Sequence, residues 1–550
     1  MTRSRRPPTW PLLLSVWATF FLFGAVAAPI PGVNEPHYLC KAKHFWQPDW
    51  CSHDFFLASP NAHSVFYATI GSLTTLCSFE QSAWIGRLLG ALVLAWGWTK
   101  CLSELLFEKW SPLWSAWIFL GFAACGNFSG EWLVGGIEGK VFAYGLLFAA
   151  CGEFLRGRVT WAAAWTGLAI SFHPVVGVWG LLAFVASRSV RVVLNALRSR
   201  RASSNISAAA PSLRHAGSGV AARSISPSSW STVFVTAARC AGVMILLAIP
   251  GLIPVVQLLT EPVAAETRYA ATYLQVYFRL AHHLDPMLFH RRAYVGYAIM
   301  CLIWISSFAW NGRTLAKKQF DAIVLWAVIF ALVGVAIGYG PRPARLMPYF
   351  AERMNLLKFY PFRLADVLVP MVLAVSLTAV LERTALFVIP RKAWLLQLNV
   401  GRISLLLLFL AAVWKVSTVS ESNRYAHEDR ADWLDACHWI DQQLPADAVV
   451  QSPTNGWAFK WFARRAEYVA FKDCPQDAAG IVEWNRRLRF LNQWYADKYA
   501  DELYSATELK ELRRLTGLTH LLTDRLGPLE LEPIYRNATF QVYDLRSLDN

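Results

Sequence analysis

The sequence predicts a polytopic all-α membrane domain with about eleven transmembrane helices, followed by a small C-terminal α/β domain. Of its 550 residues, 55% are hydrophobic and only 16% are charged, whereas roughly a quarter of a water-soluble chain is charged. The hydrophobic residues gather in runs long enough to cross a bilayer. This composition excludes a disordered, collagen-like, coiled-coil or purely soluble protein.

The first apolar run, 10–28, follows three arginines and has the outline of a signal peptide, but its length favours a retained helix. Several of the other runs are short for a bilayer of about 30 Å. The further runs cover 84–106, 111–125, 141–155, 160–171, 174–187, 233–258, 293–309, 320–339, 364–381 and 403–418.

Basic residues set the orientation of these helices. With a cytoplasmic N-terminus, the inside segments hold 20 Lys and Arg in 93 residues, and the outside loops hold 12 in 128. This bias agrees with the positive-inside rule. The transmembrane domain is therefore expected over 1–418, with a first extracytoplasmic loop at 29–81. Segment 188–232, rich in Ser, Ala and Arg, is expected to be a disordered cytoplasmic linker, with an active-site lid as the alternative.

The C-terminal region, 419–550, is expected outside the cytoplasm. From position 421 onward it has 16 basic and 21 acidic residues, a net charge of −5, so the membrane part carries +20. No basic domain is left to bind nucleic acid. Helical patterns at 432–443, 477–491 and 507–515 alternate with strand-like runs at 448–451, 468–471, 520–523 and 540–543, which is typical of an α/β domain.

Four of the ten cysteines lie outside the apolar runs. An oxidising compartment permits two disulfides among them, Cys40–Cys51 and Cys437–Cys474.

The first extracytoplasmic loop holds a candidate catalytic carboxylate. Glu35 lies close to the membrane surface, and Pro36 can begin a helix there. A carboxylate in this position suits a general base acting on a lipid-borne substrate. The alternative is that Glu35 only complements the helix dipole.

The same loop carries a family resemblance. The pattern Asn34-Glu35-x-x-Tyr38-x-x-x-Ala42-Lys43, followed by Trp-Gln-Pro-Asp-Trp at 46–50, resembles the first extracytoplasmic loop of GT-C membrane glycosyltransferases. These include the protein O-mannosyltransferase and aminoarabinose-transferase branches. The resemblance implies transfer of a sugar from a polyprenyl-phosphate carrier, with inversion at the anomeric centre, on the extracytoplasmic face of a bacterial inner membrane. It leaves a divalent cation as a candidate cofactor.

One position departs from the family pattern. The motif commonly begins with Asp, and here that residue is Asn34, which cannot act as a base. The catalytic role is therefore expected to fall to Glu35 or Asp54, or the usual chemistry has been lost.

Basic residues in the loop 340–363 predict an anion site. Outside loops should be poor in Arg, and Arg suits phosphate through its bidentate geometry. The alternative is that these residues pair with Glu352, Asp366 or lipid headgroups. The basic residues are Arg342, Arg345, Arg353, Lys358 and Arg363.

Two further sites face the same side of the membrane. Glu138 and Lys140 lie at the start of a predicted membrane span. They either form a structural ion pair, or Glu138 is a second acid at the sugar site. His173 occupies a tight Ser-Phe-His-Pro turn at membrane depth, where it is either functional or a hydrogen-bonded structural group. The expected substrate- and phosphate-binding set is Arg353, Arg363, Lys358, Lys140, Glu138 and His173.

The leading expectation is a membrane glycosyltransferase whose partners are a polyprenyl-phosphate sugar and membrane lipid. A transporter or flippase for a lipid-linked or anionic solute would have internal repeats and charges at mid-span, whereas the charges here lie mostly at span ends. A non-catalytic GT-C-like scaffold is the third alternative, because of Asn34.

Overall fold

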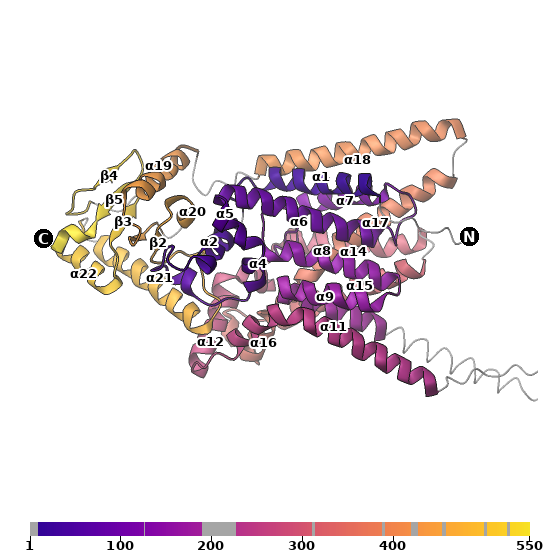
Figure 1. Ribbon diagram of the computed structural model, residues 1–550, viewed down its shortest axis with the longest axis horizontal. Helices are drawn as coiled ribbons and strands as arrows, with labels where there is room; N and C mark the ends of the chain where they lie inside the picture. Colours follow the sequence, from indigo (N-terminus) through magenta and orange to yellow (C-terminus); the bar gives the residue numbers. More distant parts are fainter. Residues whose placement is uncertain are drawn as a thin grey trace, which may run out of the picture.

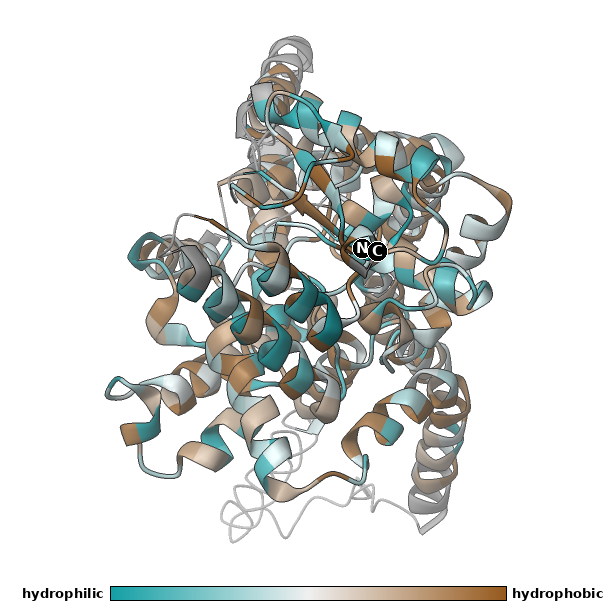
Figure 2. Cartoon of the chain, turned by 90° about the vertical axis from the view of Figure 1, so that its left-hand side faces the viewer, coloured by the Kyte–Doolittle hydropathy of each residue, from teal (hydrophilic) through white to brown (hydrophobic). Residues whose placement is uncertain are grey.

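The computed structural model describes residues 9–32, 34–125, 127–189, 227–310, 314–387, 391–419, 427–453, 458–499, 503–524 and 528–549. The molecule is elongated, with a bundle of long helices in one part and an α/β domain at the other end, where the C-terminus lies (Figure 1). Seen from that end, the domain turns many hydrophilic segments toward the viewer (Figure 2). Most of the predicted linker, 190–226, lies outside the described residues.

Each of the predicted apolar runs forms a helix. Six helices in the described parts of the chain are long and apolar enough to cross a membrane, beginning at 10, 79, 234, 291, 315 and 363. A multi-pass membrane protein is compatible with these six, and the count of eleven spans stays a prediction. The helices are α1 (Trp10–Ala27), α6 (Phe79–Leu102), α7 (Ser111–Ala124), α8 (Gly139–Leu155), α9 (Val159–Phe172), a helix over Pro174–Ser189, α11 (Pro227–Leu259), α14 (Arg291–Trp310), α15 (Leu315–Gly338), α17 (Arg363–Phe387) and α18 (Arg391–Val419).

Small residues let the central helices of the bundle pack closely. A Cβ atom added at Gly97 of α6 would overlap the carbonyl oxygen of Gly145 on α8, an approach that is common between membrane helices. Helix α1 packs against α6, α7 and α18. Its residues Leu12, Val16 and Phe20 are buried in the hydrophobic core of the bundle.

Short helices fill the junction between the bundle and the C-terminal domain (Figure 1). The first loop forms α2 (Glu35–Trp46), with Pro36 in its first turn as expected. The other elements of the first loop are α3 (Phe55–Ala58), α4 (Ser64–Ala68), η1 (Ile70–Ser72) and α5 (Leu73–Leu76). Later loops add α12 (Ala265–Leu274), the π-helical turn η2 (Gln275–Arg279), α13 (Ala281–Leu284), η3 (Pro286–Leu288), η4 (Ala344–Leu346) and α16 (Phe350–Leu357).

The C-terminal domain contains a five-stranded sheet in the order β2-β1-β3-β5-β4. Strands β2, β1 and β3 are parallel, and β5 is antiparallel to both β3 and β4. The elements are α19 (His427–Gln443), β1 (Val449–Gln451), α20 (Phe459–Ala463), β2 (Ala466–Glu467), α21 (Ala478–Tyr499), α22 (Ala506–Thr516), β3 (His520–Thr523), β4 (Tyr535–Arg536), β5 (Gln541–Asp544) and η5 (Leu545–Asp549).

Alternating strand residues form two cores, one on each face of the sheet. Leu522 packs with Trp433 of α19, whereas Leu521 packs with Trp484 of α21 and Leu512 of α22. The predicted small α/β domain is therefore present.

Two details differ from the sequence predictions. The strand predicted at 468–471 is wrong, because pairing with β1 involves Ala466 and Glu467 instead, and Ala470 and Phe471 leave the sheet to line a cavity. All ten cysteines are free thiols, so neither permitted disulfide is present. Cys437, a residue of α19, is buried in the domain core, whereas Cys474 lines the cavity.

Candidate active site

A cavity of about 920 Å³ lies where the bundle, the first loop and the C-terminal domain meet. Its wall comes from the start of α2, the loop before α8, the α12–α13 region and the 458–478 segment. Five of the predicted site residues line it: Glu138, Lys140, His173, Lys358 and Arg363. The other three, Glu35, Asp54 and Arg353, are not part of the described wall.

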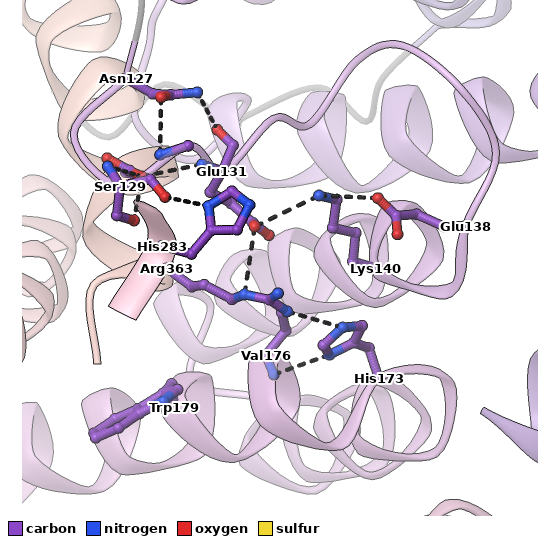
Figure 3. A network of polar contacts seen from close by, with 12 residues as sticks. Asn127, Ser129, Glu131, Glu138, Lys140, His173, Val176, Trp179, His283 and Arg363 are labelled. Carbon is purple, nitrogen blue, oxygen red and sulfur yellow. Dashed lines mark hydrogen bonds and ion pairs between the residues drawn. The ribbon is translucent and has the colours of Figure 1, made fainter. Parts of the chain in front are cut away.

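Carboxylates and cations alternate along one side of this cavity (Figure 3). Nζ of Lys140 lies 2.9 Å from Oε1 of Glu138 and 3.5 Å from Oε2 of Glu131. Nε of Arg363 lies 3.4 Å from the same Glu131 oxygen. The network therefore joins the start of α17 to the loop before α8, and the predicted Glu138–Lys140 pair is present.

Asn34 and Glu138 are neighbours in this site. The amide of Asn34 donates a hydrogen bond of 3.4 Å to Oε2 of Glu138. Burial alone would raise the pKa of Glu138, but Lys140, followed by Arg363 and His63, holds it below its usual value. Glu138 is therefore ionised at neutral pH, and it places a carboxylate beside Asn34.

Asp366 fixes the loop that carries Glu131. Its carboxylate accepts hydrogen bonds from the amides of Phe128 (2.7 Å), Ser129 (2.8 Å) and Glu131 (3.2 Å) and from the Ser129 hydroxyl (2.6 Å). His283 contacts the Ser129 carbonyl at 2.6 Å (Figure 3). Asp366, considered above as a partner for the basic residues, therefore has a positioning role.

Buried histidines line the adjoining wall. Nε2 of His173 accepts from Nη1 of Arg363 at 3.0 Å, because a guanidinium has only donors. The rings of His63 and His173 lie 5.2 Å apart, and the Tyr38 hydroxyl lies 3.4 Å from Nε2 of His63. Burial lowers the pKa of His63 to about 4, and burial followed by Arg363 lowers that of His173. Both are therefore neutral at pH 7.

Lys460 joins the C-terminal domain to the first loop. Its Nζ lies 2.6 Å from Asp473, 2.8 Å from Glu467 and 3.4 Å from Asp54. His37 of α2 contacts Asp473 at 2.9 Å. Burial alone would raise the pKa of Asp473, but Lys460 and His37 hold it well below its usual range. These contacts fix one wall of the cavity in place.

The carboxylate of Asp54 is held by contacts at this junction between the first loop and the C-terminal domain. It accepts a hydrogen bond from the Leu57 amide at 2.8 Å, which caps the start of α3, and another from the Glu467 amide at 3.0 Å. Asp54 as a whole residue is 1% exposed. This is the environment of a structural carboxylate.

Glu35 is likewise held by its neighbours. Its two oxygens accept from Nε and Nη2 of Arg87 at 2.6 and 2.8 Å, from the Gly32 amide at 2.7 Å and from the Ile137 amide at 3.0 Å. Because Ile137 directly precedes Glu138, Glu35 positions the cavity carboxylate.

The basic residues of 340–363 divide between two roles. Arg353 donates to the carbonyls of Ile337 and Tyr339 at 3.1 and 3.0 Å, at the end of α15, and Arg342 pairs with Asp285. Among the five, Lys358 and Arg363 line the cavity.

Two cavity cations come from a loop that the sequence analysis did not single out. Arg268 donates to the carbonyls of Leu259 (2.9 Å) and Glu261 (2.6 Å), and Arg279 donates to the Lys472 carbonyl (2.8 Å). Neither they nor Lys358 pairs with a carboxylate of the described chain. The sequence does carry a signal for them, because arginines on 259–292, which is predicted to be an outside loop, also oppose the positive-inside bias.

The described residues contain no group of three or more His, Cys, Asp or Glu arranged to hold a metal ion. Residues 431–491 match a family described as "Domain of unknown function (DUF6798)". The matched segment includes the Lys460, Glu467 and Asp473 cluster. Comparison with curated proteins finds no match.

Proposed function

We propose that this chain is an integral-membrane glycosyltransferase of GT-C type, which transfers a sugar from a polyprenyl-phosphate carrier to an acceptor on the extracytoplasmic face. The observation that carries the proposal is one cavity at the end of the apolar helices that holds both an ionised carboxylate, Glu138, and cations without carboxylate partners, Arg268, Arg279 and Lys358. Sugar transfer from a phosphate requires both kinds of group.

The cations support a phosphate-binding role. Nε of Arg279 is buried and has no hydrogen-bond acceptor among the described residues, and burial followed by the neighbouring charge of Arg268 lowers the pKa of Lys358. Clustered cations of this kind stabilise the charge that develops on a leaving phosphate. Arg363, between Glu131 and His173, would lie on the sugar side.

Apolar residues of α11 support a lipid-borne donor. Val255, Leu258 and Leu259 line the cavity, and the membrane-length part of α11 is only 17% buried within the protein. A polyprenyl chain can therefore lie along α11 in the bilayer while its phosphate reaches the cations.

Glu138 is the proposed base, and Glu35 and Asp54 are positioning residues. In the reaction, the acceptor hydroxyl attacks the anomeric carbon and its proton passes to Glu138. The bond from the anomeric carbon to the phosphate oxygen breaks, and the polyprenyl phosphate leaves with its electron pair. Asn34 suits this arrangement, because an Asp there would place a second negative charge beside Glu138.

A non-catalytic carrier-binding scaffold is the second candidate. The observation that favours it is that both Glu131 and Glu138 already pair with cations, which weakens a carboxylate as a base. Such a scaffold would bind the polyprenyl-phosphate sugar without transferring the sugar.

The test is sugar transfer by the full chain in liposomes, with polyprenyl-phosphate donors carrying radiolabelled hexose, N-acetylhexosamine or aminopentose. We expect turnover of one donor and its loss in Arg363→Ala and Arg279→Ala. Arg353→Ala is the matched control, because it removes the same charge outside the cavity. If no donor is turned over, or if all three variants behave alike, the proposal fails.

A further inference from the structure

A second hollow lies beside the active-site cavity, between η2 and α21. This groove has a volume of about 530 Å³. Four aromatic residues line it, Tyr273, Tyr277, Phe278 and Phe471. We call it the aromatic groove.

The π-helical turn η2 separates the two hollows. It directs Tyr277 and Phe278 to the aromatic groove, whereas Gln275 and Arg279 line the active-site cavity. Phe471 lines both, so its ring belongs to the walls of both hollows. π-Helical turns are rare and often occur at functional sites.

The rings form a partly exposed wall. Phe278 is 48% exposed and packs edge-on against Phe471, with ring centroids 5.7 Å apart. The rings of Tyr273 and Tyr277 are 5.7 Å apart, and the Tyr277 hydroxyl is buried without a hydrogen-bond partner in the described chain. The wall therefore presents apolar ring faces.

Polar side chains of α21 face this wall. Asn485, Arg489 and Asn492 are spaced four and three residues apart, which places them on one face of the helix, and all three line the groove. None makes a hydrogen bond or ion pair with another described residue. Two amides and a guanidinium thus stand opposite aromatic rings.

We propose that the aromatic groove binds a carbohydrate chain, and that this chain is the acceptor; the second part rests on the proposed glycosyltransferase function. The C–H faces of sugar rings stack on aromatic side chains, and sugar hydroxyls hydrogen-bond with planar amide and guanidinium groups. The groove has one charged residue, Arg489, which suits a neutral or weakly acidic glycan. Because Phe471 borders both the cavity and the groove, such a chain would extend past this ring from the reacting hydroxyl along α21.

The test uses the full chain in nanodiscs with maltotetraose, cellotetraose, mannotetraose and chitotetraose as probes, and it measures binding by calorimetry and saturation-transfer NMR. We expect at least one probe to bind, about tenfold more weakly to Phe278→Ala and to Asn485→Ala. Gln493→Ala is the matched control, because Gln493 is exposed on α21 but does not line the groove. Absence of binding by all four probes, or equal binding by the groove and control variants, overturns the inference.

Binding of polyprenyl phosphate, measured on the same samples, separates this inference from the proposed function. Groove variants should bind polyprenyl phosphate as wild type does. If a tetrasaccharide binds in the groove but polyprenyl phosphate does not bind, the groove assignment holds and the proposed glycosyltransferase function fails. If the donor is turned over but no tetrasaccharide binds in the groove, the proposed function holds and the groove assignment fails.

Discussion

Nε of Arg87 lies 2.6 Å from Oε1 of Glu35, and both side chains are buried where the first loop meets α6. The pair links the start of α2 to the bundle. Through the Ile137 amide it also fixes the residue before Glu138. The carboxylate that the motif indicates as catalytic is therefore part of the frame around the cavity.

Replacing Glu35 with Gln should destabilise the protein. The change leaves the Arg87 charge buried without a partner, which typically costs about 3–5 kcal/mol. Thermal unfolding of the detergent-solubilised protein, followed by Trp fluorescence, measures the effect. The double variant Glu35→Gln/Arg87→Met should recover part of the loss. Glu80→Gln, at an exposed carboxylate of α6, should change stability by less than about 0.5 kcal/mol; equal effects at positions 35 and 80 would contradict the structural role.

Replacing Lys460 with Met should loosen the C-terminal domain from the first loop. It leaves Asp54, Glu467 and Asp473 buried together without their cation. Hydrogen exchange of residues 458–474 should rise, together with exchange of the first turns of α2. Arg464→Ala removes an exposed cation that pairs with Asp441 and should leave that exchange unchanged. If Lys460→Met has no effect on exchange, the two parts are held by other contacts.

The stability of the first loop should fall as the pH drops from about 6.5 toward 4. His63 has a folded-state pKa of about 4, lowered by burial from 6.5. The unfolded chain therefore binds a proton over this interval that the folded chain does not, and the stabilisation present above pH 6.5 is lost as the pH falls through the folded pKa. The loss is on the order of 3 kcal/mol. His63→Gln should flatten the pH dependence of the unfolding temperature, and an identical slope in both proteins would contradict the assignment.

The sequence predicted the elements well where the pattern is local. Apolar runs located the helices of the bundle, and the alternation of helical and strand-like segments located the C-terminal domain. The strand at 520–523 has the predicted bounds. The second strand was misplaced because pairing with β1 ends at the Tyr468 amide, which donates to the Val450 carbonyl. The buried residues Tyr468 and Val469 then pack in the core that contains Trp484 of α21.

The candidate site was predictable only in part. Lys140, His173 and Arg363 come together as residues of one cavity wall. The partner of Glu35 is 52 residues away in the chain, and the cavity wall formed by Lys460 and Asp473 comes from another domain. Hydropathy and residue spacing do not reveal contacts between residues that are far apart in the chain. Glu35 itself lies beside this cavity and does not line it.

The most direct test of the account is the rate of sugar transfer by Glu138→Gln, compared with wild type at saturating donor. The substitution keeps the shape of the side chain and removes the proposed base. We expect the rate to fall by about 10²–10⁴-fold, with binding of polyprenyl phosphate retained. A Glu138→Gln enzyme that transfers sugar at the wild-type rate would contradict the account.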